Sequence, residues 1–180
     1  MPATFSLQVP AGDDRPRQVC DTCGFINYVN PKIVAGVVIS DDDGRILLCR
    51  RAIEPRHGFW TIPAGFMEER ETTAAGAARE AWEEARAKVQ IDGLLAIYEV
   101  PRISQVHFMY RGTLAEPGFE PGPESLEVAW FAYADIPWDD IAFPTGIWAL
   151  RDWKKVEGQA QFMPFSNPPD VEHLTHPRAR

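Results

Sequence analysis

Short apolar runs bounded by turn residues recur along the chain and predict β-strands. The runs that are rich in β-branched and aromatic residues favour extended structure. The expected strands cover residues 33–39, 46–49, 94–100, 106–114 and 128–132. The first two runs are separated by Asp41-Asp-Asp-Gly44, which is a turn sequence. We therefore expect these two strands to form an antiparallel hairpin.

Two segments carry the composition of helices. Residues 72–87 contain seven alanines with several Glu and Arg residues, and Thr72 or Thr73 can cap the N-terminus. Residues 145–156 predict a second helix. Between strands and helices, residues 55–65 form a loop region with Gly58, Pro63 and Gly65. Strands that flank two helices predict an α/β fold with a mixed sheet covered on both faces.

The length of 180 residues favours one domain with short appendages. Residues 1–31 are rich in Pro, Gly and Asp and form an N-terminal lead-in segment. Residues 32–157 hold all the expected strands and helices and form the main domain. Residues 158–180 carry several prolines, so we expect a loose C-terminal extension.

The charge and the cysteine content exclude several classes of protein. A net charge of −8 argues against nucleic acid as a partner, because duplex binding needs many Lys and Arg side chains. It suits a protein that gathers divalent cations, although it also suits one that merely stays soluble. No apolar run is long enough to cross a bilayer, and the start lacks the features of a secretory signal. Three cysteines favour a reducing compartment, so we expect a cytoplasmic protein without a membrane partner.

Three carboxylates stand close together on the first expected helix. Glu80, Glu83 and Glu84 are spaced i, i+3 and i+4, which places them on one face. Such carboxylates repel one another unless a cation lies between them, and Mg²⁺ or Mn²⁺ prefers oxygen ligands. A solvated acidic face is the alternative, since Arg79 and Glu83 also form an ordinary i, i+4 pair.

The same stretch resembles the Nudix box, the signature of the Nudix hydrolase superfamily. The matching residues are Gly65, Glu71, Arg79, Glu80, Glu83 and Glu84. The pattern departs at its end, where Arg86 stands in place of the second glycine, the usual helix exit. The resemblance implies an α/β/α sandwich with a loop–helix–loop catalytic motif.

The resemblance also implies roles for these residues. Glu80, Glu83 and Glu84, with the carbonyl group of Gly65, correspond to the ligands of Mg²⁺ or Mn²⁺. Arg79 and Glu71 correspond to an ion pair that fixes the loop against the helix. The implied reaction is attack of water on a diphosphate, in which Glu83, Glu84 and Arg79 take part. The general base is either a glutamate of the helix or Glu124 or Glu127 from a later loop.

The flanking sequence resembles the FAD and ADP-ribose pyrophosphatase subgroup, which has an N-terminal ribbon. The resemblance rests on Cys20-Asp-Thr-Cys23-Gly and on the runs Gly58–Glu68 and Pro121–Glu127. The expected substrate is a small nucleoside diphosphate linked to another group, with AMP as one product. Arg50 or Arg51 could bind its phosphates, and Phe25 or Tyr28 could stack on its ring, although aromatic residues more often pack in a core.

Several alternatives remain open at this stage. NADH or a nucleoside triphosphate could be the substrate, or the domain could sense a ligand without cleaving it. The subgroup usually has two Cys-x-x-Cys pairs that bind zinc, and this chain has one, Cys20 and Cys23. We therefore expect no zinc, with a site completed by histidine or by a partner as the alternative. The resemblance also implies a homodimer.

Overall fold

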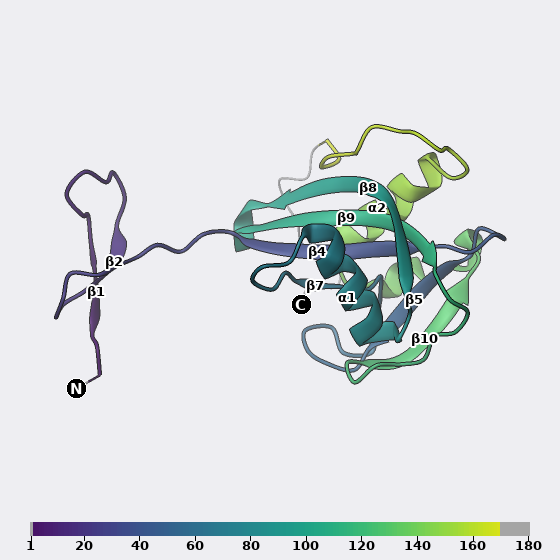
Figure 1. Cartoon of the computed structure of the whole chain (residues 1–180), viewed down its shortest axis with the longest axis horizontal. Helices are drawn as coiled ribbons and strands as arrows, with labels where there is room; N and C mark the ends of the chain where they lie inside the picture. The colour runs from purple at the N-terminus through teal and green to yellow at the C-terminus, as the bar shows by residue number, and fades with distance from the viewer. Residues whose placement is uncertain (1, 170–180) are drawn as a thin grey trace. The chain divides into compact units, whose positions relative to one another are not determined.

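The computed structural model describes residues 2–169, which belong to two compact units, Met1–Pro31 and Lys32–Arg180 (Figure 1). The expected C-terminal extension, 158–180, is therefore described only as far as residue 169. Within the described residues, no helix combines the length and the apolar character needed to span a membrane.

The first unit is a small antiparallel sheet of order β1-β2-β3. Its strands are β1 (Phe5–Gln8), β2 (Arg17–Cys20) and β3 (Ile26–Asn27). The turn after β2 is held by two backbone hydrogen bonds, from the Gly24 N–H group to the Cys20 carbonyl (2.9 Å) and from the Cys20 N–H group to the Phe25 carbonyl (2.8 Å). This turn carries both cysteines of the Cys-x-x-Cys pair.

The second unit contains two sheets. The larger has the order β7-β4-β9-β8 and is mixed, because β4 and β9 are parallel while the other neighbours are antiparallel. Its strands are β4 (Lys32–Ile39), β7 (Ala64–Phe66), β8 (Val89–Val100) and β9 (Gln105–Leu114). The smaller has the order β10-β5-β6, with β5 (Ile46–Arg51), β6 (Trp60–Thr61) and β10 (Ser125–Phe131).

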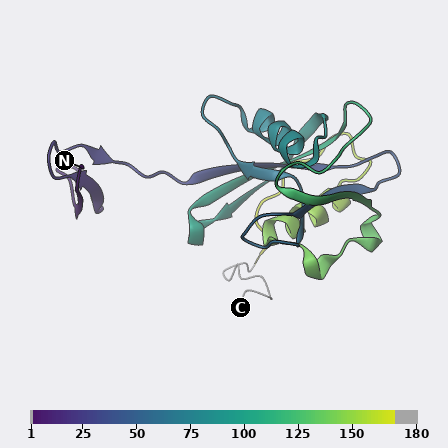
Figure 2. The same cartoon turned by 90° about the horizontal axis from the view of Figure 1, so that it is seen from below.

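Two helices cover opposite sides of the larger sheet, as Figure 2 shows. Helix α1 (Thr73–Ala85) packs its alanines against Ala35, Val37 and Ile39 of β4. Helix α2 (Pro144–Lys155) packs Trp148, Leu150 and other apolar side chains against Val38, Tyr98 and Met109. Three short 3₁₀ helices, Pro101–Ile103, Tyr133–Asp135 and Trp138–Asp140, lie in the connections. The expected α/β/α sandwich with a mixed sheet is confirmed.

Helix α1 begins and ends through local interactions. The Thr72 hydroxyl accepts a hydrogen bond from the Ala75 N–H group (3.1 Å), as an N-cap does. At the other end Arg86 adopts a left-handed conformation with φ 50°, and its N–H group donates to the Trp82 carbonyl (2.9 Å). Arg86 thus makes the exit for which the family's pattern has a glycine, at the steric cost of a side chain at positive φ.

The expected hairpin of the first two strands is wrong. The turn at Asp41 does form, but β4 and β5 enter different sheets and are joined only by a bridge between Ser40 and Ile46. Both edges of β4 are taken, by β7 and β9, and both edges of β5 are taken, by β6 and β10. Strand pairing with distant segments therefore overrides the local turn signal.

The described part of the tail is packed rather than loose. The Phe165 N–H group donates to the Leu95 carbonyl, and the Ile97 N–H group donates to the Phe165 carbonyl, both at 2.9 Å. The Asn167 side chain bonds both backbone groups of Glu99 at 2.8 Å. Phe162 and Phe165 also pack against the apolar core on the α2 side. The tail residues that the structure describes therefore cover part of β8.

Candidate active site

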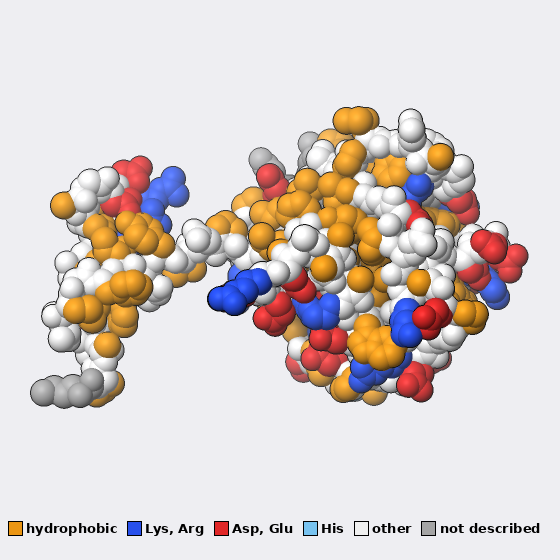
Figure 3. Space-filling view, viewed as in Figure 1, with side chains coloured by type: hydrophobic (Ala, Val, Ile, Leu, Met, Phe, Trp, Pro, Cys, Tyr) orange, Lys and Arg blue, Asp and Glu red, His pale blue; other side chains and the backbone are white. Residues whose placement is uncertain are grey.

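A cavity of about 770 Å³ lies in the second unit, where the larger sheet, the loop after β5 and the start of α2 meet helix α1. One part of its wall is charged, with carboxylates from α1 and with Arg51. The remaining lining combines many apolar side chains with polar and charged ones such as Arg102, Gln105 and His107. The apolar lining comes from Val34, Ile53, Pro55, Ile62, Val100, Ile103, Met109 and Phe143. In the space-filling view, acidic side chains lie beside basic ones over the α1 region of this unit (Figure 3).

Two glutamates of α1 line the cavity and contact strand β7. Glu80 and Glu84 are both buried, with exposed fractions of 8% and 6%. The Glu84 carboxylate accepts a hydrogen bond from the Ala64 N–H group (3.2 Å). The Glu80 carboxylate lies so close to Gly65 that a Cβ atom there would be 2.4 Å from it. The glycine of the predicted motif is therefore needed for this close approach.

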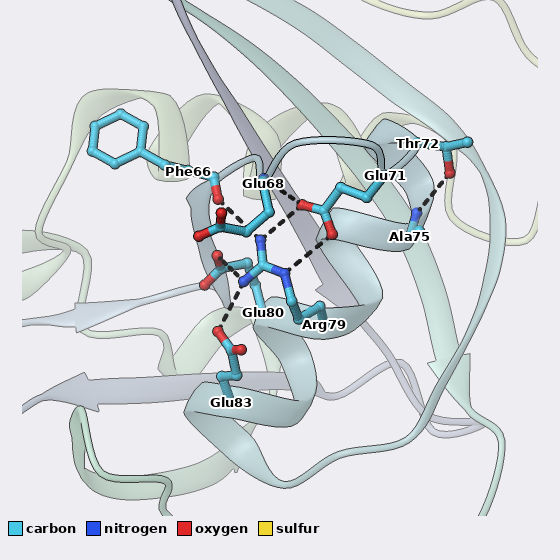
Figure 4. Close-up of polar contacts among 8 residues, drawn as sticks. All are labelled: Phe66, Glu68, Glu71, Thr72, Ala75, Arg79, Glu80 and Glu83. Atoms are coloured by element: carbon cyan, nitrogen blue, oxygen red, sulfur yellow. Dashed lines mark hydrogen bonds and ion pairs between the residues drawn. The ribbon is translucent and has the colours of Figure 1, made fainter.

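Arg79 connects the loop and the helix of the motif, as Figure 4 shows. Its Nε and Nη2 atoms donate to the two oxygens of Glu71, at 3.1 and 2.9 Å. Its Nη2 atom also donates to the Phe66 carbonyl (2.9 Å). Its Nη1 atom donates to Glu80 and Glu83, both at 2.8 Å. The guanidinium group thus holds the loop and neutralises part of the acidic cluster.

The carboxylates of the motif fall into two electrostatic groups. The hydrogen bonds from Arg79 and from the Glu68 N–H group lower the pKa of Glu71. Burial raises the pKa of Glu80, in spite of the opposing effect of Arg79. Burial, together with the charge of Glu80, raises the pKa of Glu84 to about 8. Glu71 is therefore a stable anion, whereas Glu80 and Glu84 hold their charges only at a free-energy cost.

The charged part of the cavity fits a divalent metal ion. Glu80, Glu83 and Glu84 offer hard oxygen donors, and a cation would offset the burial and the charge of Glu80 that raise the pKa of Glu84. The three carboxylates do not face a common point at which an ion could bind, because Arg79 forms ion pairs with Glu80 and Glu83. Accordingly, no three His, Cys, Asp or Glu side chains within residues 2–169 are gathered tightly enough to hold an ion. Binding would require Glu83 to turn from Arg79 toward Glu80 and Glu84.

Of the two candidate phosphate-binding arginines, Arg51 lines the cavity and Arg50 does not. Successive side chains of β5 point to opposite faces, so Arg51 is buried while Arg50 is exposed. The Arg51 Nε atom donates to the Pro55 carbonyl (2.9 Å), and its guanidinium group lies 5.1 Å from the centre of the Phe143 ring. Its charge also acts on Glu84. Arg51 is therefore the one held beside the carboxylates.

Of the two loop glutamates, Glu124 lines the cavity and Glu127 does not. The charge of Glu124 acts on both Glu80 and Glu84. Glu127 lies opposite Arg50 in the β10–β5 pair, with 3.7 Å between their charged atoms, and both side chains are exposed. A bulge between Ser125 and Glu127 separates the two positions. The placement favours Glu124 over Glu127 as a group that could act on a bound substrate.

The two aromatic residues proposed for stacking lie in the first unit. Phe25 and Tyr28 are exposed, and the Arg17 guanidinium group lies 5.3 Å from the centre of the Tyr28 ring. Their role stays a prediction. The apolar cavity wall, including Ile53, Ile103 and Phe143, was not predicted, because these residues come from separate elements and share no sequence motif.

A sandwich of this kind, with an acidic helix at the edge of a large cavity, has the fold of the Nudix hydrolases. The chain belongs to the Nudix family: residues 30–150 match the family model of the NUDIX domain. The crystal structure of a NUDIX hydrolase from Nitrosomonas europaea is 44% identical and superposes with a TM-score of 0.83, covering 91% of this chain and 93% of that one.

Curated relatives match parts of the chain. A MutT-like protein of Streptomyces ambofaciens is 37% identical over 103 residues, which are 57% of this chain and 64% of that protein. An ADP-ribose pyrophosphatase of Methanocaldococcus jannaschii is 32% identical over 74 residues, which are 41% of this chain and 43% of that protein. In both, the match spans less than two thirds of the relative's own length.

The first unit also matches a family model. Residues 3–29 match a zinc-ribbon family described as Nudix N-terminal, which weighs against our expectation that this segment binds no zinc. Backbone N–H groups of Cys23 and Thr22 point to the Cys20 sulfur and lower the pKa of its thiol. This arrangement favours the thiolate form of Cys20, which is the form that binds zinc.

Proposed function

We propose that the protein is a Mg²⁺- or Mn²⁺-dependent pyrophosphatase that cleaves a nucleoside diphosphate linked to another group, with ADP-ribose or FAD as substrate. The observation that carries this proposal is the mixed lining of the cavity, one part of which is made by the α1 carboxylates and Arg51 and another part by apolar side chains. A diphosphate bearing an organic group needs both parts. The ADP-ribose pyrophosphatase among the relatives supports the same substrate class.

In this proposal Glu80, Glu83 and Glu84, with the Gly65 carbonyl, hold the metal ion. The bound ion supplies positive charge to the phosphate oxygens and lowers the pKa of the attacking water. Arg51 binds the diphosphate on the side facing Phe143, where its guanidinium group is already held by the Pro55 carbonyl. Arg79 fixes the loop against α1, so that Gly65 and Glu80 stay in contact.

Glu124 is the group that we assign to proton transfer from the attacking water. It lines the cavity and comes from a loop that is bonded to the end of α1, where the Gly122 N–H group donates to the Glu84 carbonyl (2.9 Å). A Cβ atom at Gly122 would lie 1.7 Å from the Glu83 carbonyl oxygen, so this loop touches the helix backbone. The loop therefore carries Glu124 at a fixed place relative to the carboxylates of α1.

The organisation around the site is part of the proposal. Residues 1–31 form the ribbon, 32–157 the hydrolase domain and 158–180 the extension. The homodimer and the cytoplasmic location follow from the family resemblance and from the cysteine content. Light scattering on the purified chain measures whether it is a dimer. Elemental analysis of the same sample measures zinc in the ribbon.

A substrate panel tests the proposal. Purified protein is incubated with ADP-ribose, FAD, NADH and a nucleoside triphosphate, with Mg²⁺, with Mn²⁺ or with EDTA. We expect AMP and a phosphomonoester from ADP-ribose or FAD, and no product with EDTA. Release of pyrophosphate from the triphosphate alone would assign a different activity. Binding of ADP-ribose without turnover would indicate a sensing domain instead.

A further inference from the structure

The histidine of β9 lies in the wall of the cavity with half of its ring unbonded. His107 pairs with Val34 on one side and with Tyr98 on the other, so it sits in the middle of the larger sheet. It is buried, with an exposed fraction of 9%, and it lines the cavity. Its side chain lies on the same face of β9 as that of Met109, two residues on, which also lines the cavity.

One ring nitrogen of His107 has a partner and the other has none. The Nε2 atom lies 2.9 Å from the Oε1 atom of Gln105. The Nδ1 atom has no hydrogen-bond partner and almost no accessible surface, so a ligand group contacts it only when neighbouring side chains move aside. Among residues 2–169, Arg111 Nε is the only other buried side-chain nitrogen or oxygen in this state, and Arg111 does not line this cavity. Leaving such an atom unpaired costs roughly 1–3 kcal/mol, so native proteins retain few of them without a reason.

The bond to Gln105 determines what the free nitrogen can do. A carbonyl oxygen accepts, so Nε2 carries the proton and Nδ1 of the neutral ring presents a lone pair. Burial lowers the pKa of His107 to about 4, which keeps the ring neutral at physiological pH. A neutral acceptor repels phosphate oxygens and attracts an N–H or O–H group. Its partner therefore belongs to the organic part of a ligand.

The surroundings of His107 point to the same part of the ligand. Val34, Val100, Ile103 and Met109 line the cavity together with it, as do Arg102 and Gln105, so this acceptor stands in a part of the lining that has several apolar side chains. Sites for small organic ligands have this composition, in which few polar groups within an apolar lining fix the orientation of the ligand. A purine ring with an amino group has apolar faces and a donor at its edge, and a ribose offers hydroxyl donors.

We propose that His107 is a specificity-determining residue, whose Nδ1 atom accepts a hydrogen bond from an N–H or O–H group of the substrate's nucleoside. This inference rests on the proposed function, because it takes the substrate to be a nucleoside diphosphate derivative. The donor is either the amino group of the base or a hydroxyl group of the ribose. Gln105 is a positioning residue in this scheme, since it acts through the ring of His107.

The test compares two variants of His107 on ADP-ribose. His107→Phe keeps a ring and removes both nitrogens, whereas His107→Asn places an amide oxygen near the position of Nδ1. We expect His107→Phe to raise KM about tenfold, which corresponds to one hydrogen bond of about 1.4 kcal/mol, with kcat within about twofold of the wild type. His107→Asn restores most of the loss. His57→Asn, outside the cavity lining, is the matched control.

Substrate analogues identify the donor without any variant. An ADP-ribose analogue that lacks the 6-amino group tests the base, and 2′-deoxy and 3′-deoxy analogues of the adenosine ribose test the sugar. For one of these, we expect the wild type to show the same tenfold rise in KM, and His107→Phe to show no further rise. If every analogue keeps its KM in the wild type, or if His107→Phe still discriminates among them, the inference is overturned.

The proposed function and the role of His107 are overturned by different outcomes. If the wild type cleaves none of the diphosphates, the proposed function falls, and the His107 comparison is made on the Kd of ADP-ribose by calorimetry. If it cleaves ADP-ribose and His107→Phe, shown to be folded by circular dichroism, has an unchanged KM, only the inference on His107 falls. If the wild type neither cleaves nor binds ADP-ribose, both fall. If His107→Phe does not fold, His107→Asn and the analogues decide the question.

Discussion

Arg79 and Glu71 are joined by two parallel hydrogen bonds, from Nε to Oε2 at 3.1 Å and from Nη2 to Oε1 at 2.9 Å. A planar guanidinium group is the side chain that can make such a pair. The pair links the loop before α1 to the middle of the helix and leaves Nη1 free to bond Glu80 and Glu83. Both contacts with the acidic cluster therefore depend on the position of one side chain.

Replacing Arg79 with Lys keeps the charge and removes the paired geometry. An ammonium group cannot bond both oxygens of Glu71 and also the Phe66 carbonyl, so we expect kcat to fall about 10- to 100-fold, as for other residues that orient metal ligands. The measurement is kcat and KM for the substrate found in the panel. Arg45→Lys is the control, because Arg45 makes an ion pair with Asp41 in an exposed turn outside the cavity. Equal effects of the two changes would contradict the assigned role.

Gly65→Ala separates catalysis from folding. The new Cβ atom would lie 2.4 Å from the Glu80 carboxyl group, which is the far end of a flexible side chain and can move away. We therefore expect a small change in Tm but at least a tenfold loss of kcat/KM, because the displaced carboxylate no longer faces the cavity. Gly93→Ala in β8 is the matched control, since its Cβ atom would meet no atom within 4 Å. Normal activity of Gly65→Ala would show that the position of Glu80 is unimportant.

The two loop glutamates make a direct comparison. Because Glu124 lines the cavity, we expect Glu124→Gln to lower kcat by about a hundredfold or more, as the loss of a general base does. Glu127→Gln removes an exposed charge paired with Arg50 and should leave kcat nearly unchanged. The pH profile of kcat distinguishes a base from a merely structural group, because its acidic limb should disappear in Glu124→Gln. If Glu127→Gln lowers kcat more than Glu124→Gln does, Glu127 is the general base instead.

The catalytic motif could be predicted because its parts are local. Glu80, Glu83 and Glu84 lie on one helix, so their spacing in the sequence already places them together in space. The same holds for Arg79, whose partners Glu71 and Phe66 lie 8 and 13 residues away in sequence. The choice between Arg50 and Arg51 needed the register of β5, because only the fold decides which face of the strand looks into the cavity.

The remainder of the site depends on contacts between distant segments. His107 comes from β9 and Phe143 from the residue before α2, and nothing in the sequence between them indicates that they line one cavity. The mistaken hairpin has the same origin. The local turn at Asp41 predicted a pairing of β4 with β5, but β4 pairs with β7 on one edge and with β9 on the other. Local sequence patterns therefore predicted the helices, the strands and the catalytic motif. They did not predict which strands pair or which distant residues line the cavity.

The raised pKa of Glu84 predicts how stability and metal binding depend on pH. Its pKa is about 8 in the folded protein and about 4.5 when exposed, so between these values the folded state keeps a proton that the unfolded state has lost. Without metal, stability should therefore fall as pH rises from about 4.5 to about 8, by up to about 1.4 kcal/mol per pH unit. Urea unfolding in EDTA across this range measures the slope, and Glu84→Gln should remove most of it.

Metal ions should reverse this effect, because a metal ion binds the ionised carboxylate and displaces the proton. We expect Mg²⁺ to raise Tm more at pH 8 than at pH 6, and calorimetry in two buffers of different ionisation enthalpy to show proton release at pH 7. The Glu84→Gln variant should lose both responses, since its amide has no proton to release and only weak affinity for Mg²⁺. Because a metal ion binds the ionised form of Glu84, an Mg²⁺ response that is the same at both pH values would exclude Glu84 as a ligand.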